Sequence, residues 1–395
     1  MKPIQIAEKI FDVGVTDWNI RDFHGYSTEQ GSTYNAFLIL DEKIALIDTV
    51  KKEYADQLLS HISQIVDPAR IDYVISNHTE MDHTGALAQV MQAVGPDTPL
   101  VCSKMGHKNL SAHFRNAWNY QTVQSKDTLS LGSRTLSFLE TRMLHWPDSM
   151  FTYLAEDKIL FSSDAFGQHY AGPEKYDDVM GEAVMPHARK YFANILLPYS
   201  DLILKLIEQV GQMGLEIEMI CPDHGVIWRK QPEKIIEAYG RWSRQIPEKK
   251  ALVVYDTMWH STEKMAEAIV EGFIEAGVRA RPIHIRSSHR SDIMTELMDA
   301  RALVVGSPTL NNGLFPTVSD FLTYMKGLRP KNKIGAAFGS YGWSGEAVKL
   351  VNRELEDAKI QLVDSGLKIA YVPGPEQLEQ CVDFGKKIAA AVLAD

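Results

Sequence analysis

Four side chains that can bind a metal ion lie within one short segment, at His78, Glu80, Asp82 and His83. The segment directly follows residues 72–77, a run typical of a buried strand. Buried carboxylates without partners cost several kcal/mol, and a cation is their obvious partner. No cysteine lies nearby, which argues against structural zinc, whereas mixed imidazole and carboxylate ligands suit iron, manganese or catalytic zinc. The alternative is a polar loop with accidental spacing.

Three more candidate ligands each follow a short strand-like run, and they are His145, Asp164 and His224. Strand ends are where a layered αβ scaffold presents its site residues. Each of the three taken alone also fits a hydrogen-bonded loop residue, and Asp164 fits a helix cap or a turn. The need of the first cluster for partners favours the interpretation as ligands.

The seven side chains divide into two ligand sets around a shared carboxylate. The first set is His78, Glu80 and His145, the second is Asp82, His83 and His224, and Asp164 has two oxygens with which to bridge them. Three negative charges suit two divalent cations better than one.

Residues 251–395 have the pattern of five strand–helix repeats. Apolar runs predict strands at 251–255, 280–285, 302–306, 333–338 and 368–372. Helix-like stretches such as 262–273 separate them. This alternation predicts a doubly wound parallel sheet. The domain boundary is expected in the linker 245–250, with domains 1–248 and 249–395.

Three loops at the carboxyl ends of these strands lie where open α/β sheets bind ligands. The first lacks the glycine patterns of nucleotide-binding loops but offers hydroxyls and amides at a helix N-terminus, which also fits an ordinary capped helix. The other two carry small residues together with Tyr341 and Trp343, whose rings can flank a planar group. The candidate cofactor-binding residues are Thr257, Met258, Trp259, His260, Ser261, Thr262, Pro308, Thr309, Leu310, Asn311, Asn312, Ser340, Tyr341, Gly342, Trp343, Ser344 and Gly345.

The ordered ligand set resembles the metallo-β-lactamase fold, in which many hydrolases carry His-x-His-x-Asp-His and then a His, an Asp and a His. Glu80 departs from that pattern and matches the flavodiiron proteins. The three loops of the second half resemble flavodoxin, which implies FMN. The resemblance therefore implies an N-terminal metallo-β-lactamase-like αββα sandwich with two non-haem iron ions, followed by a flavodoxin-like doubly wound parallel five-stranded sheet.

The resemblance also implies an activity: reduction of O₂ to water, of NO to N₂O, or of both. Two ferrous ions and reduced FMN together supply the four electrons that O₂ reduction needs. No motif separates the two gases, and O₂ is our first expectation. Electrons would come from rubredoxin or a similar small protein, docked on basic residues of the second half. These residues, which also fit an ordinary solvated surface, are Arg286, Arg290, Lys326, Arg329, Lys331 and Lys333.

Further expectations from the family concern assembly and the surroundings of the metals. Family members are head-to-tail homodimers, so we expect such a dimer or a dimer of dimers. His24, Tyr26 and His169 are expected to donate protons or to orient the bound gas, the alternative being ordinary hydrogen-bonded polar residues. Two other functions stay open: a zinc hydrolase fused to a flavodoxin, and a non-catalytic electron-transfer flavoprotein.

Composition excludes several other classes. The formal net charge of −10 argues against nonspecific nucleic-acid binding. No apolar run reaches the roughly 18–20 residues of a membrane helix, and the N-terminus lacks a signal-peptide core. Three scattered cysteines predict a reducing compartment, the cytoplasm. Without a Cys-x-x-Cys motif there is no built-in rubredoxin domain, so the electron donor is expected to be a separate protein.

Overall fold

The computed structural model describes residues 2–394 and divides the chain into two compact units. The first unit contains the chain up to His24, Thr28–Phe192 and Tyr199–Ser243, and the second contains the remainder. Two short segments therefore group with the C-terminal half, Gly25–Ser27 and Ala193–Pro198. The expected domain boundary at 248/249 falls where β17 (Glu248–Tyr255) begins, and it stays a prediction.

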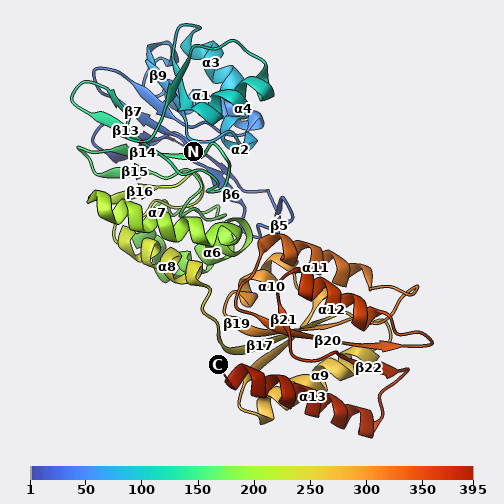
Figure 1. Cartoon of the computed structure of the whole chain (residues 1–395). Coiled ribbons are helices and arrows are strands. Elements are labelled where there is room, and N and C mark those ends of the chain that lie inside the picture. Colours follow the sequence, from blue (N-terminus) through green and yellow to red (C-terminus); the bar gives the residue numbers. More distant parts are fainter. Residues whose placement is uncertain (1, 395) are drawn as a thin grey trace. The chain divides into compact units, whose positions relative to one another are not determined.

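The first unit is built on two sheets (Figure 1). One has the order β1-β2-β7-β8-β9-β10-β11, with bounds Ile4–Ala7, Ile10–Asp12, Phe37–Ile39, Ala45–Ile47, Tyr73–Ser76, Leu100–Ser103 and Tyr120–Val123. The other has the order β12-β13-β14-β15-β16, with bounds Thr128–Ser130, Thr135–Glu140, Met150–Leu154, Ile159–Phe161 and Met219–Cys221. Short strands β3 (Val15–Asp17) and β6 (Ser32–Tyr34) pair separately, and β4 and β5 are Asp22–Phe23 and Tyr26–Ser27.

Helices cover the outer faces of both sheets, as the predicted αββα sandwich requires (Figure 1). Their bounds are α1 Ala55–Ser63, α2 Met81–Thr84, α3 Leu87–Val94, α4 Lys104–Phe114, α5 Asp177–Met180, α6 Val184–Tyr191, α7 Ser200–Met213 and α8 Pro232–Arg244. Alternation along β8 explains the layering, because Leu46 packs in the cluster that contains α1 and α3, whereas Ile47 packs in the cluster that contains Phe161 of the other sheet.

Parallel pairing places the carboxyl ends of key strands side by side. Ile47 of β8 pairs with Ile75 of β9, so the loops after these two strands begin together. Phe161 of β15 pairs with Cys221 of β16 in the same way. Each of these pairs sets two loops beside each other, and the candidate ligands lie in such loops.

The second unit is a doubly wound parallel sheet, as predicted (Figure 1). The order β18-β17-β19-β20 is extended by β21 and β22, and the bounds are Arg279–His284, Glu248–Tyr255, Ala300–Gly306, Ile334–Tyr341, Gln361–Leu362 and Leu367–Ala370. Helices α9 and α13 cover one face and α10, α11 and α12 the other, with bounds Ser261–Glu275, Pro375–Leu393, Arg290–Leu297, Pro316–Leu328 and Ala347–Asp357. The fifth strand position is shared, because β21 and β22 both pair with β20 at successive places along it.

The basic residues expected to dock an electron donor do not form one free cluster. Lys333 is buried, and its ammonium donates to the carbonyl of Met298 at 2.9 Å. Three others are in ion pairs: Arg286 with Asp256, Arg290 with Asp320 and Lys326 with Glu354. The prediction of a docking patch was therefore wrong for Lys333, and those three charges are already paired.

Across residues 2–394, none of the helices combines the length and the apolar character that crossing a membrane requires.

Lys333→Glu should destabilise the second unit by about 3 kcal/mol or more, because it replaces a bonded ammonium with a buried, unpaired carboxylate. Lys331→Glu, at an exposed position two residues away, should change stability by less than about 0.5 kcal/mol. Hydrogen exchange of the β20 amides measures both. Equal effects of the two substitutions would show that burial at position 333 does not matter.

Candidate metal centre and flavin cavity

The loop that carries the first ligand cluster is anchored by the end of β8. Asp48 accepts two hydrogen bonds from Asn77, from its backbone N–H at 2.8 Å and its side-chain amide at 2.7 Å. Thr49 Oγ1 donates to the carbonyl of His83 at 2.6 Å. From the other sheet, Thr152 Oγ1 donates to Asn77 Oδ1 at 2.7 Å. These hydrogen bonds thus fix both ends of the loop before any metal ion binds.

Sequence reasoning missed Asp48 and Thr49, although a signal was present. Both follow a strand-like apolar run, Ala45–Ile47, just as the predicted ligands follow theirs. Asp and Thr are also common turn residues, so composition alone does not single them out.

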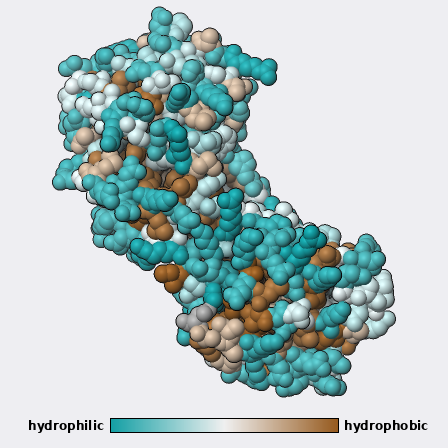
Figure 2. All heavy atoms as spheres, in the orientation of Figure 1, coloured by the Kyte–Doolittle hydropathy of each residue, from teal (hydrophilic) through white to brown (hydrophobic). Residues whose placement is uncertain are grey.

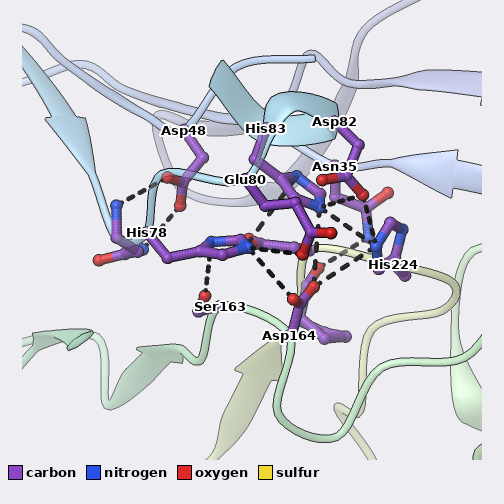
Figure 3. A network of polar contacts seen from close by, with 12 residues as sticks. Asn35, Asp48, His78, Glu80, Asp82, His83, Ser163, Asp164 and His224 are labelled. Carbon is purple, nitrogen blue, oxygen red and sulfur yellow. Dashed lines mark hydrogen bonds and ion pairs between the residues drawn. The ribbon is translucent and has the colours of Figure 1, made fainter. Parts of the chain in front are cut away.

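All seven predicted ligands lie close together, and Figure 3 labels each of them except His145. Their donor atoms form the two groups His78–Glu80–His145–Asp164 and Asp82–His83–His224, each within 4.8 Å. A third group of the same kind joins His78, His83 and Asp164 to Asp223, which sequence reasoning did not select. Asp223 directly precedes His224, and that position was its only signal.

The first ligand set closes around one oxygen of Asp164. His145 Nε2 lies 2.8 Å from Asp164 Oδ2 and 2.9 Å from Glu80 Oε2. His78 Nε2 lies 3.1 Å from the same Asp164 oxygen. The donor atoms of His78, Glu80 and His145 therefore lie on the Oδ2 side of Asp164, the candidate bridging carboxylate.

The second set closes around the other oxygen. Asp82 Oδ2 lies 3.1 Å from His83 Nε2 and also 3.1 Å from His224 Nε2. Asp164 Oδ1 lies 3.7 Å and 3.4 Å from the same two nitrogens. Asp164 thus presents one oxygen to each set, which is the geometry of a carboxylate that bridges two cations.

Partners on the far ring nitrogens orient two of the imidazoles. His224 Nδ1 donates to the carbonyl of Thr33 at 2.6 Å, which turns its Nε2 into the site, 3.1 Å from Asp82 Oδ2. His78 Nδ1 faces Ser163 Oγ at 3.0 Å, and its Nε2 points into the site. Such outer contacts fix both the tautomer and the direction of a ligating histidine.

Without bound cations, the buried acidic and imidazole groups of the site have strongly shifted pKa values. Burial opposes ionisation of Asp164, but His78 and His145 outweigh it and hold the pKa of this carboxyl well below its usual range. Burial likewise opposes the charge on His145, yet Asp164 and Glu80 raise its pKa to about 9. Burial and the neighbouring Asp48 raise the pKa of Asp223 well above normal.

Orphaned atoms show that the donor set fits metal ions. Within the described chain, His78 Nε2, Asp82 Oδ1 and Asp164 Oδ1 are buried and make no hydrogen bond. Unsatisfied buried polar atoms cost free energy that a bound cation would recover. Four imidazoles and three carboxylates also match the ligand preference of divalent iron.

The three residues predicted to lie around the metals, His24, Tyr26 and His169, differ in their burial and contacts. His24 Nε2 lies 3.0 Å from Glu80 Oε1, and its side chain is 71% exposed. His169 is buried, with Nδ1 2.8 Å from Ser32 Oγ and its ring 4.7 Å from that of His224. Tyr26 is buried in the segment that groups with the second unit. Its predicted role stays untested.

A tyrosine that the sequence did not single out lies beside the ligands. Tyr191 is buried in the last turn of α6, with its ring 5.9 Å from that of His224 and 5.1 Å from that of His169. Its neighbours on the helix, which include Arg189 and Lys190, gave no sign of this placement.

The second unit has a cavity of about 350 Å³ at the carboxyl ends of its strands. Eleven of the predicted cofactor-binding residues line it: Met258, Trp259, Ser261, Pro308, Thr309, Leu310, Asn311, Ser340, Tyr341, Gly342 and Trp343. The lining also includes Tyr371 and Val372, which the sequence prediction placed inside the strand 368–372, whereas β22 ends at Ala370.

Six predicted residues are not part of this lining, and most have other partners. Thr262 is buried and its hydroxyl lies 2.8 Å from Ser340 Oγ. His260 pairs with Glu263, and Ser344 donates to Asn312. Thr257 is buried, and Gly345 has a positive φ of 79°.

The fold and these two sites define a metallo-β-lactamase-like domain joined to a flavodoxin-like domain. Residues 33–225 match the model of the ODP family beta lactamase, and residues 253–385 match flavodoxin. The chain is 46% identical to a nitric oxide reductase of Moorella thermoacetica, over 99% of each chain. It is 45% identical to the rubredoxin-oxygen oxidoreductase of Megalodesulfovibrio gigas, over 98% of each.

Solved structures give the same assignment. The rubredoxin oxygen:oxidoreductase of Desulfovibrio gigas superposes with a TM-score of 0.97 at 43% identity, covering 100% of this chain and 99% of that one. The flavodiiron protein of Giardia intestinalis gives 0.95 at 36%, covering 100% and 97%. The chain belongs to the flavodiiron family of oxidoreductases.

The metal-free protein should lose stability as pH rises, because the pKa of His145 is raised from 6.5 to about 9 in the folded state. The stabilisation is fully present below pH 6.5 and disappears as pH rises toward 9, by about 3 kcal/mol at most. Urea unfolding of the chelator-treated chain measures this loss. His145→Gln should flatten the dependence, and an unchanged slope would contradict the assignment.

Ferrous ion added without oxygen should raise the unfolding temperature of the first unit, because it neutralises the buried carboxylates of Asp82 and Asp164. Asp164→Asn should abolish most of this gain. Calorimetry of the metal-free chain, with and without the ion, tests both statements. The transition of the second unit serves as the internal control and should not move.

Proposed function

We propose that this protein reduces a diatomic gas at a non-haem di-iron centre, converting O₂ to water, NO to N₂O, or both. The observation that carries the proposal is the convergence of seven metal-competent side chains on one buried space, in a chain that also has a flavodoxin-type cavity. The names of the two curated relatives, one for NO and one for oxygen, support the same pair of substrates. We place O₂ slightly ahead of NO.

The residues of the first unit would hold two iron ions in the sets described above. His78, Glu80 and His145 would bind one ion, and Asp82, His83 and His224 the other. Asp164 would bridge them, since one of its oxygens faces each set. The ions and reduced FMN, when bound, supply the electrons for the reaction.

Two residues outside these sets would manage protons and orientation. His24 would hold Glu80 in place through its 3.0 Å contact, and its exposed ring connects that carboxylate with solvent. His169 would line the inner side, where burial keeps the pKa of its imidazole well below normal and the ring neutral. A neutral ring beside His224 adds no repulsion to bound cations.

The flavodoxin-type cavity would bind FMN, with Ser261 at the first turn of α9 near the phosphate and Tyr341 and Trp343 beside the ring. Rubredoxin or a similar small protein would deliver electrons to it, as the name of the M. gigas relative supports. We further propose that the protein forms a head-to-tail homodimer. We also propose that the boundary between its two domains lies at 248/249 in the sequence.

The test is anaerobic single turnover of the reduced, iron-loaded protein with limiting O₂ and, separately, limiting NO. Rapid oxidation of flavin and iron by O₂ without peroxide would support an oxygen reductase. Rapid N₂O formation would support a nitric oxide reductase. Neither reaction, despite two bound iron ions, would overturn the proposal and favour a hydrolase.

Glu80→Gln should strongly slow gas reduction while FMN reduction by the donor stays unchanged, because only the metal centre loses a charged ligand. Glu53→Gln is the matched control, since Glu53 is exposed and lines the same outer pocket as Glu80. Equal activity of the two variants would remove Glu80 from the ligand set.

A further inference from the structure

An apolar cavity of about 350 Å³ lies beneath α7 in the first unit. The helix contributes Ile203, Leu206, Ile207 and Val210, whose spacing places them on one face. Only Ile203 of these four is fully buried, and the other three are half-buried. A tightly packed helix would bury the whole face, so the hollow separates this face from the sheet below.

The inner wall of the cavity belongs to the ligand loops. Leu144 and Ala165 line it, and both are buried. Leu144 directly precedes His145, and Ala165 directly follows Asp164. The cavity wall therefore contains the sequence neighbours of His145 and Asp164, whose donor atoms lie 2.8 Å apart in the metal centre.

The outer end of the cavity adjoins a surface cleft. Ile217 and Glu233 line both the cavity and a second hollow of about 550 Å³, whose other lining residues include charged Arg229 and Lys230. Figure 2 shows hydrophobic side chains gathered on the surface where Figure 1 places α7. The exposed members of that helix include Leu202 and Met213. An apolar space thus lies between the surface and the ligand loops.

The lining suits a small apolar molecule better than water. A buried water needs two to four polar partners. Among the described residues that line the cavity, Glu233 carries the one charge, at the outer end, and the Tyr239 hydroxyl already accepts the N–H of Phe166 at 2.7 Å. A diatomic gas loses no hydrogen bonds on entering, and dry cavities lined by Leu, Ile and Phe bind xenon.

We propose that this cavity is a binding site for the diatomic substrate on its way from the surface to the metal centre. The inference rests on the proposed function, which supplies the gas, and adds the route and the residues that form it. The occupant follows from the lining chemistry and from the place of Leu144 and Ala165, which line the cavity and lie next to His145 and Asp164 in the sequence.

Xenon tests the binding site without any need for activity. Crystals of the full-length, metal-free protein pressurised with xenon should show xenon beside Ile207 and Leu144. No xenon in the cavity would overturn the proposal, whatever the protein catalyses. Xenon in the cavity would support the proposal whichever of the two gases, O₂ or NO, the protein reduces.

Ile207→Trp tests the route, because the larger ring fills the cavity from α7. It should raise KM for the gas that the wild type reduces several-fold, with kcat at saturating gas and iron content unchanged. Leu202→Trp is the matched control, on the same helix but outside the lining and 38% exposed, and should leave KM unchanged. Val210→Phe provides a milder filling if the first variant folds poorly, and should raise KM less.

Equal KM values for the cavity-filling variants and the Leu202→Trp control would overturn the route. Loss of kcat with an unchanged KM would also overturn it, since that result indicates damage to the metal centre. A wild type without gas reduction would instead refute the proposed function, and xenon binding would still be read independently.

Discussion

The first unit depends on opposite charges brought together out of water. Asp82 and Asp164 are almost completely buried, and each lies within 4 Å of at least two imidazoles. Such an arrangement is costly unless every partner is held in place. Thr33 of β6 and Ser163 hold two of the imidazoles, and Asp48 holds the loop that carries His78. Asp48 and Ser163 come from loops that parallel strand pairing sets beside the other ligand loops. The αββα sandwich thus positions the charged side chains of one buried centre.

The second unit differs in that its candidate cofactor site lies near the surface. Its cavity is open, and Trp259 and Trp343 at its edge are each 85% exposed. A redox cofactor that receives electrons from another protein must lie near the surface, whereas a centre that reduces a gas gains from a dry, fixed environment. The apolar hollow under α7 fits this contrast, because it would admit a gas to the buried centre through a space that disfavours water. One chain therefore combines an open cavity in the second unit with a largely buried charged centre in the first.

Much of this arrangement could be predicted from the sequence, because metal ligands are restricted in type and spacing. The convergence of His145, Asp164 and His224 on the first cluster followed from their positions after strands, and the helix-like stretch 262–273 lies within α9. Asp48 could not be separated from ordinary turn residues. The prediction failed for Lys333, because lysine is seldom buried and its bond to a backbone carbonyl leaves no trace in the sequence. Nor does any composition signal reveal that Gly25–Ser27 groups with the second unit, where Ser27 bonds Ser291.

Anomalous scattering at the iron absorption edge, from crystals of the anaerobically iron-loaded protein, tests the central claim most directly. The account predicts two iron ions in the first unit, roughly 3.5–4 Å apart as in other two-metal sites. Asp164 should lie between them, with His78, Glu80 and His145 on one and Asp82, His83 and His224 on the other. A single ion, or iron bound elsewhere while these seven side chains keep only their ion pairs, would contradict it.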